Sequence, residues 1–185
     1  MNEKIRTAFF FIPYLLPVSF FSISLKWDIW KCILAVLFSM VIICIMYFGE
    51  RKTLQIILDK EIMGLLPRIS KESYYYRQVE LLGSAIVEEL FYRGYLLIEL
   101  KKKHTIICAV VVVSIMFLVT HIFNLHAKER FDLSSYFQIL ILSFFLSALY
   151  LISENMLFPV IVHSLFNMPN MYRNYLLLER RSFND

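Results

Sequence analysis

Long apolar stretches alternate with short polar segments along the chain. Each stretch approaches the roughly 20 helical residues that cross about 30 Å of hydrocarbon. Six of them lie at approximately 8–25, 29–48, 79–99, 105–123, 136–152 and 155–172. Only helices or closed barrels satisfy their backbone groups in lipid, and the period-two alternation of barrel strands is missing. The pattern therefore predicts an all-α, polytopic membrane bundle with about six transmembrane helices.

The pattern also predicts one integral membrane domain over residues 1–185. Two spans lie in 1–50, an amphipathic linker in 51–78 and a core of four helices in 79–172. In the linker, apolar residues repeat at helical spacing, at Leu54, Ile57, Leu58, Ile62 and Leu65. This repeat predicts a helix that either lies in the membrane interface or packs on the ends of the spans.

Composition agrees with a membrane protein. Hydrophobic residues make up 59% of the chain, aromatic residues 16%, and the mean hydropathy is +0.63, well beyond a soluble globular composition. The net charge is +4, but the basic residues cluster between apolar stretches, where they fit topology markers and lipid headgroup contacts rather than nucleic acid. The three cysteines all lie in apolar stretches without metal-ligand spacing and imply no disulfide framework.

The distribution of Lys and Arg predicts the topology. With the N-terminus inside, thirteen of the nineteen basic residues fall on the inner side and five on the outer side, while Arg93 is intramembrane. The positive-inside bias therefore predicts that both termini are cytoplasmic. The basic cluster Lys101–Lys103 opposes this assignment.

One apolar span carries three formal charges, in the run Glu88-Glu89-Leu90-Phe91-Tyr92-Arg93. Each charge at the centre of a span costs roughly 2.5 to 3.5 kcal/mol, so such residues are functional candidates. Glu89 and Arg93 are four apart on one helical face and are expected to form an ion pair. Glu88 lies about 100° away around the helix, so it needs a partner on another span or must be neutral. The alternative is that all three charges are structural.

Two later spans carry histidine. His121 follows Phe117 by one helical turn, and His163 precedes Asn167 by one turn. His163 and Asn167 therefore present two hydrogen-bonding groups on one helical face. Each histidine taken singly fits a packing role, but together with Glu88 they are the strongly polar groups of the last four spans that can converge on an interior cavity.

These residue types fit hydrolysis by an activated water. A buried carboxylate beside an imidazole can take a proton from water, and donors such as His163 and Asn167 can stabilise the oxyanion that forms on an attacked carbonyl. The competing assignment is a zinc site made by Glu88, His121 and His163, although the sequence has no HExxH motif. No other cofactor is expected. A serine nucleophile fits poorly, because no serine stands in a G-x-S-x-G or S-x-x-K arrangement.

The three motifs resemble those of the CAAX protease and bacteriocin-processing (CPBP) family, also called the Abi family of intramembrane endopeptidases. They are Glu88-Glu89-x-x-x-Arg93, Phe117-x-x-x-His121 and His163-x-x-x-Asn167. The resemblance covers roughly residues 62 to 170 and includes the segment Met63-Gly64-Leu65-Leu66-Pro67, which is similar to one that many members carry before the first motif.

This resemblance implies a helical intramembrane protease in a bacterial cell membrane. Glu88 and His121 would activate water, His163 and Asn167 would form the oxyanion site, and Glu89 and Arg93 would support it. The substrate would be a membrane-associated peptide or a lipid-anchored protein tail. Two alternatives stay open: a non-proteolytic membrane protein that confers bacteriocin immunity or binds a peptide, and a small proton-coupled carrier.

Overall fold

The computed structural model describes residues 11, 12, 14, 23–123 and 133–179. Every regular element in these ranges is a helix, and the extended backbone makes one isolated bridge between Leu25 and Asn155. The predicted all-α class is therefore confirmed. In chain order the helices are α2 (Ile29–Gly49), α3 (Arg51–Leu58), α4 (Lys60–Leu65), α5 (Lys71–Phe91), the π-helix η2 (Tyr92–Leu96), α6 (Leu97–Lys103), α7 (Ile106–Ile122), α8 (Leu133–Ser153) and α9 (Leu157–Glu179).

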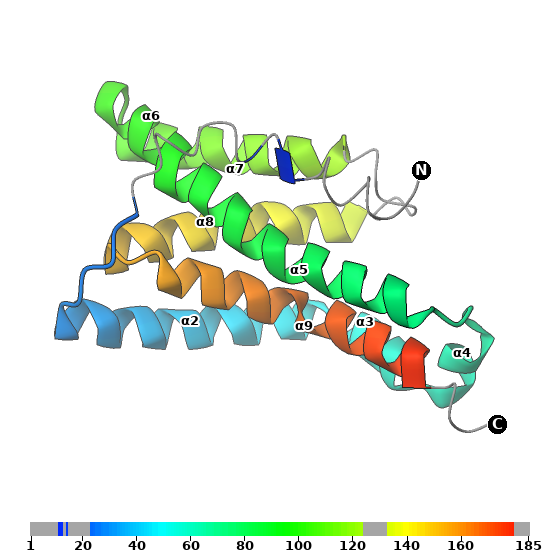
Figure 1. Cartoon of the computed structure of the whole chain (residues 1–185). Helices are drawn as coiled ribbons and strands as arrows, with labels where there is room; N and C mark the ends of the chain where they lie inside the picture. The colour runs from blue at the N-terminus through cyan, green and yellow to red at the C-terminus, as the bar shows by residue number, and fades with distance from the viewer. Residues whose placement is uncertain (1–10, 13, 15–22, 124–132, 180–185) are drawn as a thin grey trace.

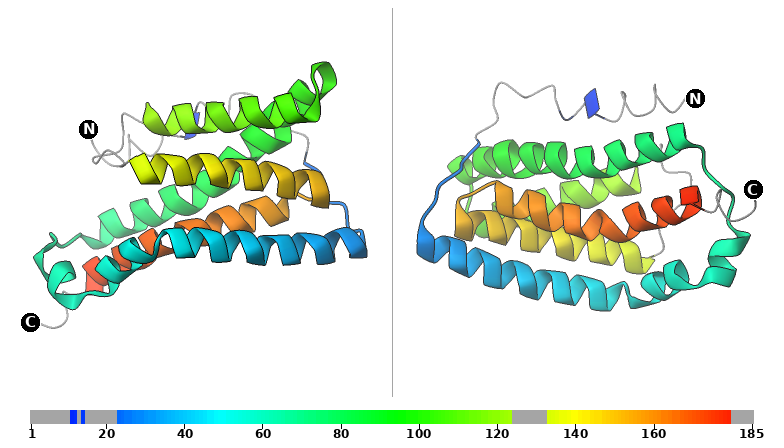
Figure 2. Two further views of the ribbon diagram at one scale, coloured as in Figure 1. Left: turned by 180° about the vertical axis from the view of Figure 1, so that it is seen from behind. Right: turned by 60° about the horizontal axis from the view of Figure 1, so that its bottom comes forward.

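The long helices form a bundle in which successive members run in alternating directions (Figure 1). α9 packs against α5, α8 and α2, while α8 also packs against α7 and α2. α5, η2 and α6 join end to end into one long element along a face of the bundle (Figure 2). A polar side chain on α5 can therefore meet groups from α8 and α9 in the interior.

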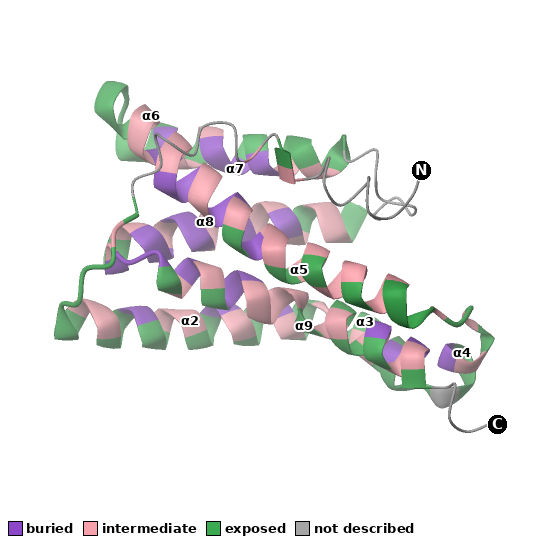
Figure 3. Cartoon of the chain, viewed as in Figure 1, coloured by how far each residue is buried: buried purple, intermediate pink, exposed green. Residues whose placement is uncertain are grey.

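Two hydrophobic clusters form the core. One joins the α5–α6 element to α7 and α8, with Tyr92, Leu97, Val113, Phe117 and Ile139 among its buried members. The other joins α2, α8 and α9, with Ala35, Ile42, Leu142, Leu146, Leu149 and Val162. Outward faces are also apolar: Trp30 is 73% exposed and Ile107 78% exposed, and Figure 3 shows the exposed surface running along α2. A bundle that is apolar both inside and outside is suited to lipid.

Five of the six predicted spans are occupied by long helices or helix series, while most of the first, 8–25, lies outside the described residues. On length and composition alone, two helices in the described ranges could cross a membrane, Ile29–Gly49 and Leu133–Ser153. Ile106–Ile122 is apolar but only 17 residues long. Six crossings therefore remain a prediction, as do the positions of both termini relative to the membrane.

The linker contains two short helices instead of one. Asp59 divides them, because its side chain accepts hydrogen bonds from the backbone N–H groups of Glu61 and Ile62 and so begins α4. Ile57 is buried, whereas Leu65 is 87% exposed. The linker thus packs on the bundle through one part of its surface and leaves another part apolar and uncovered.

α9 continues through Pro169 to Glu179, beyond the predicted end at 172. Proline has no N–H, so the carbonyl of Leu165, four residues earlier, lacks its helical donor. The hydroxyl of Tyr47 on α2 donates to that carbonyl at 3.0 Å. A donor from a neighbouring helix therefore lets α9 pass through its proline.

Candidate active site

α5 carries both glutamates in its last turn, directly before η2. α5 begins at Lys71, eight residues before the predicted span starts at 79. Ser70 caps this end, because its hydroxyl accepts a hydrogen bond from the backbone N–H of Ser73. η2 then adds a π turn that holds Tyr92, Arg93 and Gly94, all buried. π turns inside α-helices occur often at functional sites, and this one lies one turn beyond Glu88.

The predicted ion pair between Glu89 and Arg93 is present. Glu89 Oε1 accepts from Arg93 Nη1 at 2.9 Å, and both side chains are fully buried. Arg93 Nη2 donates to the carbonyl and the hydroxyl of Ser143 on α8, each at 2.8 Å. The guanidinium also lies over the ring of Phe117 on α7, 5.1 Å from its centroid. Arg93 thereby links the helix that carries the glutamates to two neighbours.

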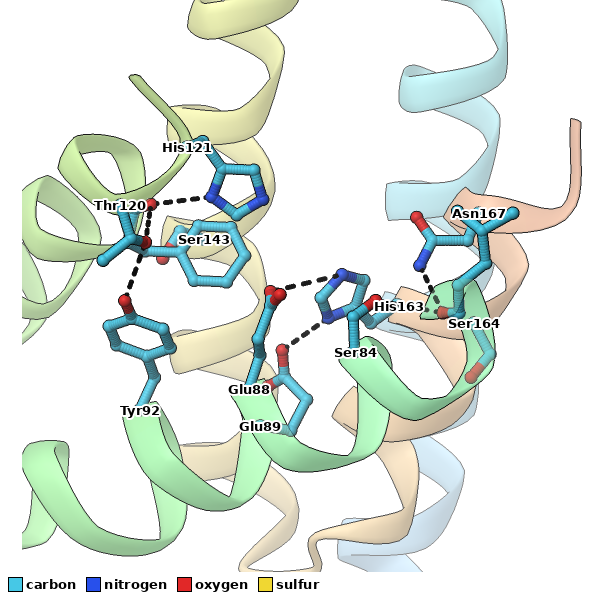
Figure 4. Close-up of polar contacts among 12 residues, drawn as sticks. Ser84, Glu88, Glu89, Tyr92, Thr120, His121, Ser143, His163, Ser164 and Asn167 are labelled. Atoms are coloured by element: carbon cyan, nitrogen blue, oxygen red, sulfur yellow. Dashed lines mark hydrogen bonds and ion pairs between the residues drawn. The ribbon is translucent and has the colours of Figure 1, made fainter. Parts of the chain in front are cut away.

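His163 faces both glutamates, one with each ring nitrogen (Figure 4). Its Nδ1 is 2.9 Å from Glu89 Oε1, and its Nε2 is 4.0 Å from Glu88 Oε2. An ionised carboxylate only accepts, so the Nδ1 proton is donated to Glu89, and in the neutral ring Nε2 presents a lone pair toward Glu88. Two acceptors cannot form a hydrogen bond with each other, and at a separation of 4.0 Å they suit a bridging donor such as water.

His121 is close to Glu88 but makes no hydrogen bond with it among the described contacts. Its Nδ1 donates to the Phe117 carbonyl at 2.8 Å within its own helix, so in a neutral ring Nε2 is again an acceptor. In Figure 4 the rings of His121 and His163 lie on either side of the Glu88 carboxylate. The Phe117 ring contacts both imidazoles, with centroids 4.6 Å from His121 and 5.9 Å from His163.

Asn167 does not join His163 at one point as the helical spacing predicts. Its Nδ2 donates to the carbonyl of Leu81 on α5 at 2.9 Å, a carbonyl that also accepts from the Ser84 hydroxyl at 3.1 Å. In Figure 4 Asn167 lies beyond Ser84, on the far side of His163 from Glu88. The amide would have to release Leu81 to reach a substrate bound at Glu88.

The site is enclosed and incompletely satisfied. The exposed fractions of Glu88, Glu89, Arg93 and His163 are 4% or less. Three polar atoms in this cluster have no hydrogen-bond partner: Glu88 Oε2, Glu89 Oε2 and Arg93 Nε. Unpartnered buried polar atoms are costly, and Glu88 Oε2 is the one that faces an imidazole nitrogen.

The residues proposed for zinc do not form a metal-binding group. Within the described ranges, no three His, Cys, Asp or Glu side chains are placed so that they could hold a metal ion. His121 directs its Nδ1 to Phe117 and His163 directs its Nδ1 to Glu89, contacts that histidines also make when Nε2 holds a metal. The three side chains are nevertheless not gathered into a three-ligand zinc site in the structure.

Two contributors to the site were not predicted from the sequence. Ser143 on α8 accepts from Arg93, and Tyr92 shares a 2.8 Å hydrogen bond with Thr120 on α7. Small residues four apart, Ser143 and Ser147, are a signal for close helix packing that could have marked α8. For Tyr92, a position one turn after Glu88 on the same face was available as a signal.

Comparison with known proteins agrees with the motifs. The model of the family described as "Type II CAAX prenyl endopeptidase Rce1-like" matches residues 73–169. That range runs from α5 to α9 and contains all the residues assigned to the site. Neither the comparison with curated proteins nor the comparison with solved structures gives a match.

Proposed function

Because the chain belongs to the Rce1-like family of type II CAAX prenyl endopeptidases, we propose that it cleaves a peptide bond within the membrane by means of a water activated at Glu88. Family membership makes it a protease that acts on membrane-anchored protein or peptide substrates. The observation that carries the proposal is the gap of 4.0 Å between Glu88 Oε2 and His163 Nε2, inside an enclosed site.

In the proposed reaction, water occupies the position between acceptors that the site provides. Glu88 takes one proton from the water while the water oxygen attacks the carbonyl carbon of the substrate. Glu88 later delivers that proton to the departing amide nitrogen. The products are a new carboxyl terminus and a new amine. No covalent enzyme intermediate is needed.

The remaining residues have supporting roles. His121, one of the two imidazoles near Glu88, assists the deprotonation. Asn167 stabilises the oxyanion after it exchanges the Leu81 carbonyl for the substrate, and His163 does so in its protonated form, in which Nε2 also carries a proton that it can donate. Glu89 and Arg93 hold His163 and the helix ends in place through the contacts described above.

The proposed substrate is a membrane-associated peptide or a lipid-anchored protein tail. A bacteriocin precursor would be one substrate of this class. A prenylated cysteine near a C-terminus is the substrate that the family description indicates. The alternative, a non-proteolytic immunity or peptide-binding protein, is not favoured by the family match. It would use the same enclosed residues for recognition, without turnover.

The test is cleavage of two internally quenched peptides by reconstituted protein, one with a farnesylated cysteine near its C-terminus and one with the unmodified cysteine. Glu88→Gln removes the base but keeps the shape, so we expect a loss of at least about 10³-fold in kcat. His121→Ala should lower kcat by about 10- to 100-fold. Glu99→Gln, an exposed charge removal on α6, is the matched control and should cleave as the wild type does.

Retention of cleavage by Glu88→Gln would refute the general-base assignment. Binding of either peptide by the wild type without cleavage would favour the non-proteolytic function. Activity of metal-stripped protein, unchanged by a chelator, is the expected result for a glutamate-type enzyme. Loss on stripping with recovery on added Zn²⁺ would instead establish the zinc alternative.

A further inference from the structure

Polar side chains continue from the site along the contact between α5 and α9, which we call the α5–α9 seam. Successive seam positions are three or four residues apart, the spacing of a helix face that packs against a neighbour. They are Gln78, Leu81, Ala85 and Glu88 on α5 and His163, Asn167, Met171 and Asn174 on α9. Away from Glu88, the seam leads to the end of the bundle at which α5 begins and α9 ends (Figure 1).

Two side-chain amides cross the seam in opposite directions. Asn167 on α9 donates to the Leu81 carbonyl on α5 at 2.9 Å, and Gln78 Nε2 on α5 donates to the Met171 carbonyl on α9 at 3.0 Å. Both carbonyls lie inside helices, so each also has the backbone N–H four residues later as a donor. Either amide can therefore exchange its carbonyl for another one without leaving the first unpaired.

Gln78 also has an unfilled hydrogen-bonding position. Its Oε1 is buried and has no partner among the described residues, which is a costly state for a polar atom. A primary amide presents a donor and an acceptor side by side, and an extended peptide offers the complementary carbonyl and N–H groups. Gln78 thus combines a donor that can be released with an acceptor that needs a partner.

The position of Gln78 sets the length of peptide that could reach it. Gln78 precedes Glu88 by ten residues, which corresponds to about 15 Å along the helix. An extended peptide covers this distance with about four or five residues. A C-a-a-X tail has only a few residues after its cysteine, so the residues before the cysteine are the ones that are long enough to reach Gln78.

We propose that Gln78 is a substrate-binding residue, and that its amide holds the peptide backbone of the substrate about four or five residues before the scissile bond. The substrate lies along the α5–α9 seam, where Gln78 and Asn167 exchange the Met171 and Leu81 carbonyls for its backbone groups. This inference rests on the function proposed above and deepens it. An extended tail has free backbone groups, whereas a helical segment does not, so Gln78 selects for extended tails.

The first experiment combines a substitution with a change in peptide length. Two farnesylated peptides carry about eight and about two residues before the cysteine, so that only the longer one reaches Gln78. Gln78→Met keeps the length of the side chain but removes the amide. We expect it to lower kcat/KM for the long peptide about 10-fold, mainly through KM. For the short peptide, kcat/KM should stay within about twofold of the wild type.

Gln138→Met is the matched control. Gln138 also has a buried, unpartnered Oε1, but it lies on α8 beside Gly49 of α2, so its loss should affect both peptides by the same factor. Gln78→Asn is a second variant, which shortens the side chain by one methylene and should show the length dependence of Gln78→Met.

Partial unfolding of a variant lowers both rates equally, so the ratio of the two rates reports the contact itself. Equal losses for both peptides in Gln78→Met and Gln78→Asn would overturn the proposal. A kcat/KM for the long peptide within about twofold of the wild type would also overturn it.

The second experiment needs no turnover. Unlabelled peptides compete with a dye-labelled long peptide for Glu88→Gln protein, and fluorescence polarisation gives their Kd. The long peptide should bind about 10-fold more tightly than the short one, and adding Gln78→Met should remove this difference. If the wild type cleaves neither peptide but this preference is seen, the proposed function fails and the binding role of Gln78 stands. Equal binding of the two peptides would refute that role.

Discussion

Glu88 and Glu89 are adjacent and identical in type, yet they lie in opposite chemical surroundings. Glu89 Oε1 accepts two hydrogen bonds, and its partners extend to Ser143 on α8 and His163 on α9. Glu88 has an unpartnered oxygen, with an imidazole lone pair 4.0 Å away. A step of one residue around a helix is enough to separate a carboxylate that joins three helices from one that makes no hydrogen bond at Oε2.

The difference follows from how buried charges are tolerated. A buried carboxylate is tolerated when a cation and further hydrogen bonds offset its charge. Glu89 Oε1 has both Arg93 and His163, and Arg93 Nη2 has two acceptors on Ser143, although Glu89 Oε2 and Arg93 Nε have no partner. No Lys or Arg side chain forms an ion pair with Glu88 among the described contacts. The negative charge of its carboxylate is therefore offset only when a hydrogen-bond donor such as water binds there. The following predictions test this contrast from the largest expected effect to the smallest.

Arg93→Met should cost about 3–5 kcal/mol in free energy of unfolding, because it leaves Glu89 buried without its cation. Thermal unfolding in detergent measures the loss. Adding Glu89→Gln removes the stranded charge and should restore a large part of the stability.

Glu88→Gln is the matched change on the other side. It removes a charge that makes no hydrogen bond at Oε2, so stability should stay within about 1 kcal/mol of the wild type. If Glu88→Gln destabilises as strongly as Arg93→Met, the proposed division between a structural Glu89 and a reactive Glu88 is wrong.

Ser143→Ala should cost about 1–2 kcal/mol, since a buried, charged donor loses one of its acceptors. Ser147→Ala is the control on the same helix face, because its hydroxyl donates only to the Ser143 carbonyl, and should cost less than about 1 kcal/mol. Chemical denaturation of both variants gives the comparison. Equal losses would show that Arg93 gains nothing from the hydroxyl.

The smallest effect is expected outside the spans, at an ion pair that solvent reaches. Hydrogen bonds from Lys26 and Lys31 lower the pKa of Glu154 from 4.5 to about 2. A carboxyl whose pKa is lowered by folding stabilises the fold above its unfolded value, and this contribution is lost as the pH falls toward 2.

Acidification from about pH 5 to about pH 2.5 should therefore loosen the contact between residues 23–28 and the α8–α9 connection. Hydrogen exchange of the Met156 amide, which donates to the Ser24 carbonyl at 2.9 Å, reports this contact after correction for intrinsic rates. Glu154→Gln should be loosened at both pH values. A wild type that responds no more than this variant would contradict the assignment.

Local spacing predicted the parts of the site that lie within one helix. The Glu89–Arg93 pair follows from a separation of four residues, and the helical class follows from the length of the apolar stretches. The 4.0 Å gap and the Arg93–Ser143 contact depend on how α5, α8 and α9 are placed relative to one another. Periodicity within one helix carries no information on that placement.

Three other differences have local physical causes. α5 starts before the predicted span because Ser70 caps it at Lys71. Its first turns are polar, so a search for apolar stretches does not include them. The π turn after Phe91 changes the angular position of later residues, so a helical wheel loses its register there. Asn167 binds Leu81 because a partly buried amide takes the carbonyl that lies within its reach on α5.

The hydrogen bond from Tyr47 to Leu165 bears on where an independently stable fragment could be cut. The family match begins at residue 73, which makes a fragment without α2 look like a natural minimal enzyme. Such a fragment would lack Tyr47, so the Leu165 carbonyl, two residues after His163, would lose the donor that replaces the missing N–H of Pro169. It would also expose the hydrophobic cluster that Ala35 and Ile42 of α2 form with α8 and α9. The boundary of sequence similarity is thus not a boundary of folding, and α2 belongs to the smallest unit expected to keep the catalytic helix intact.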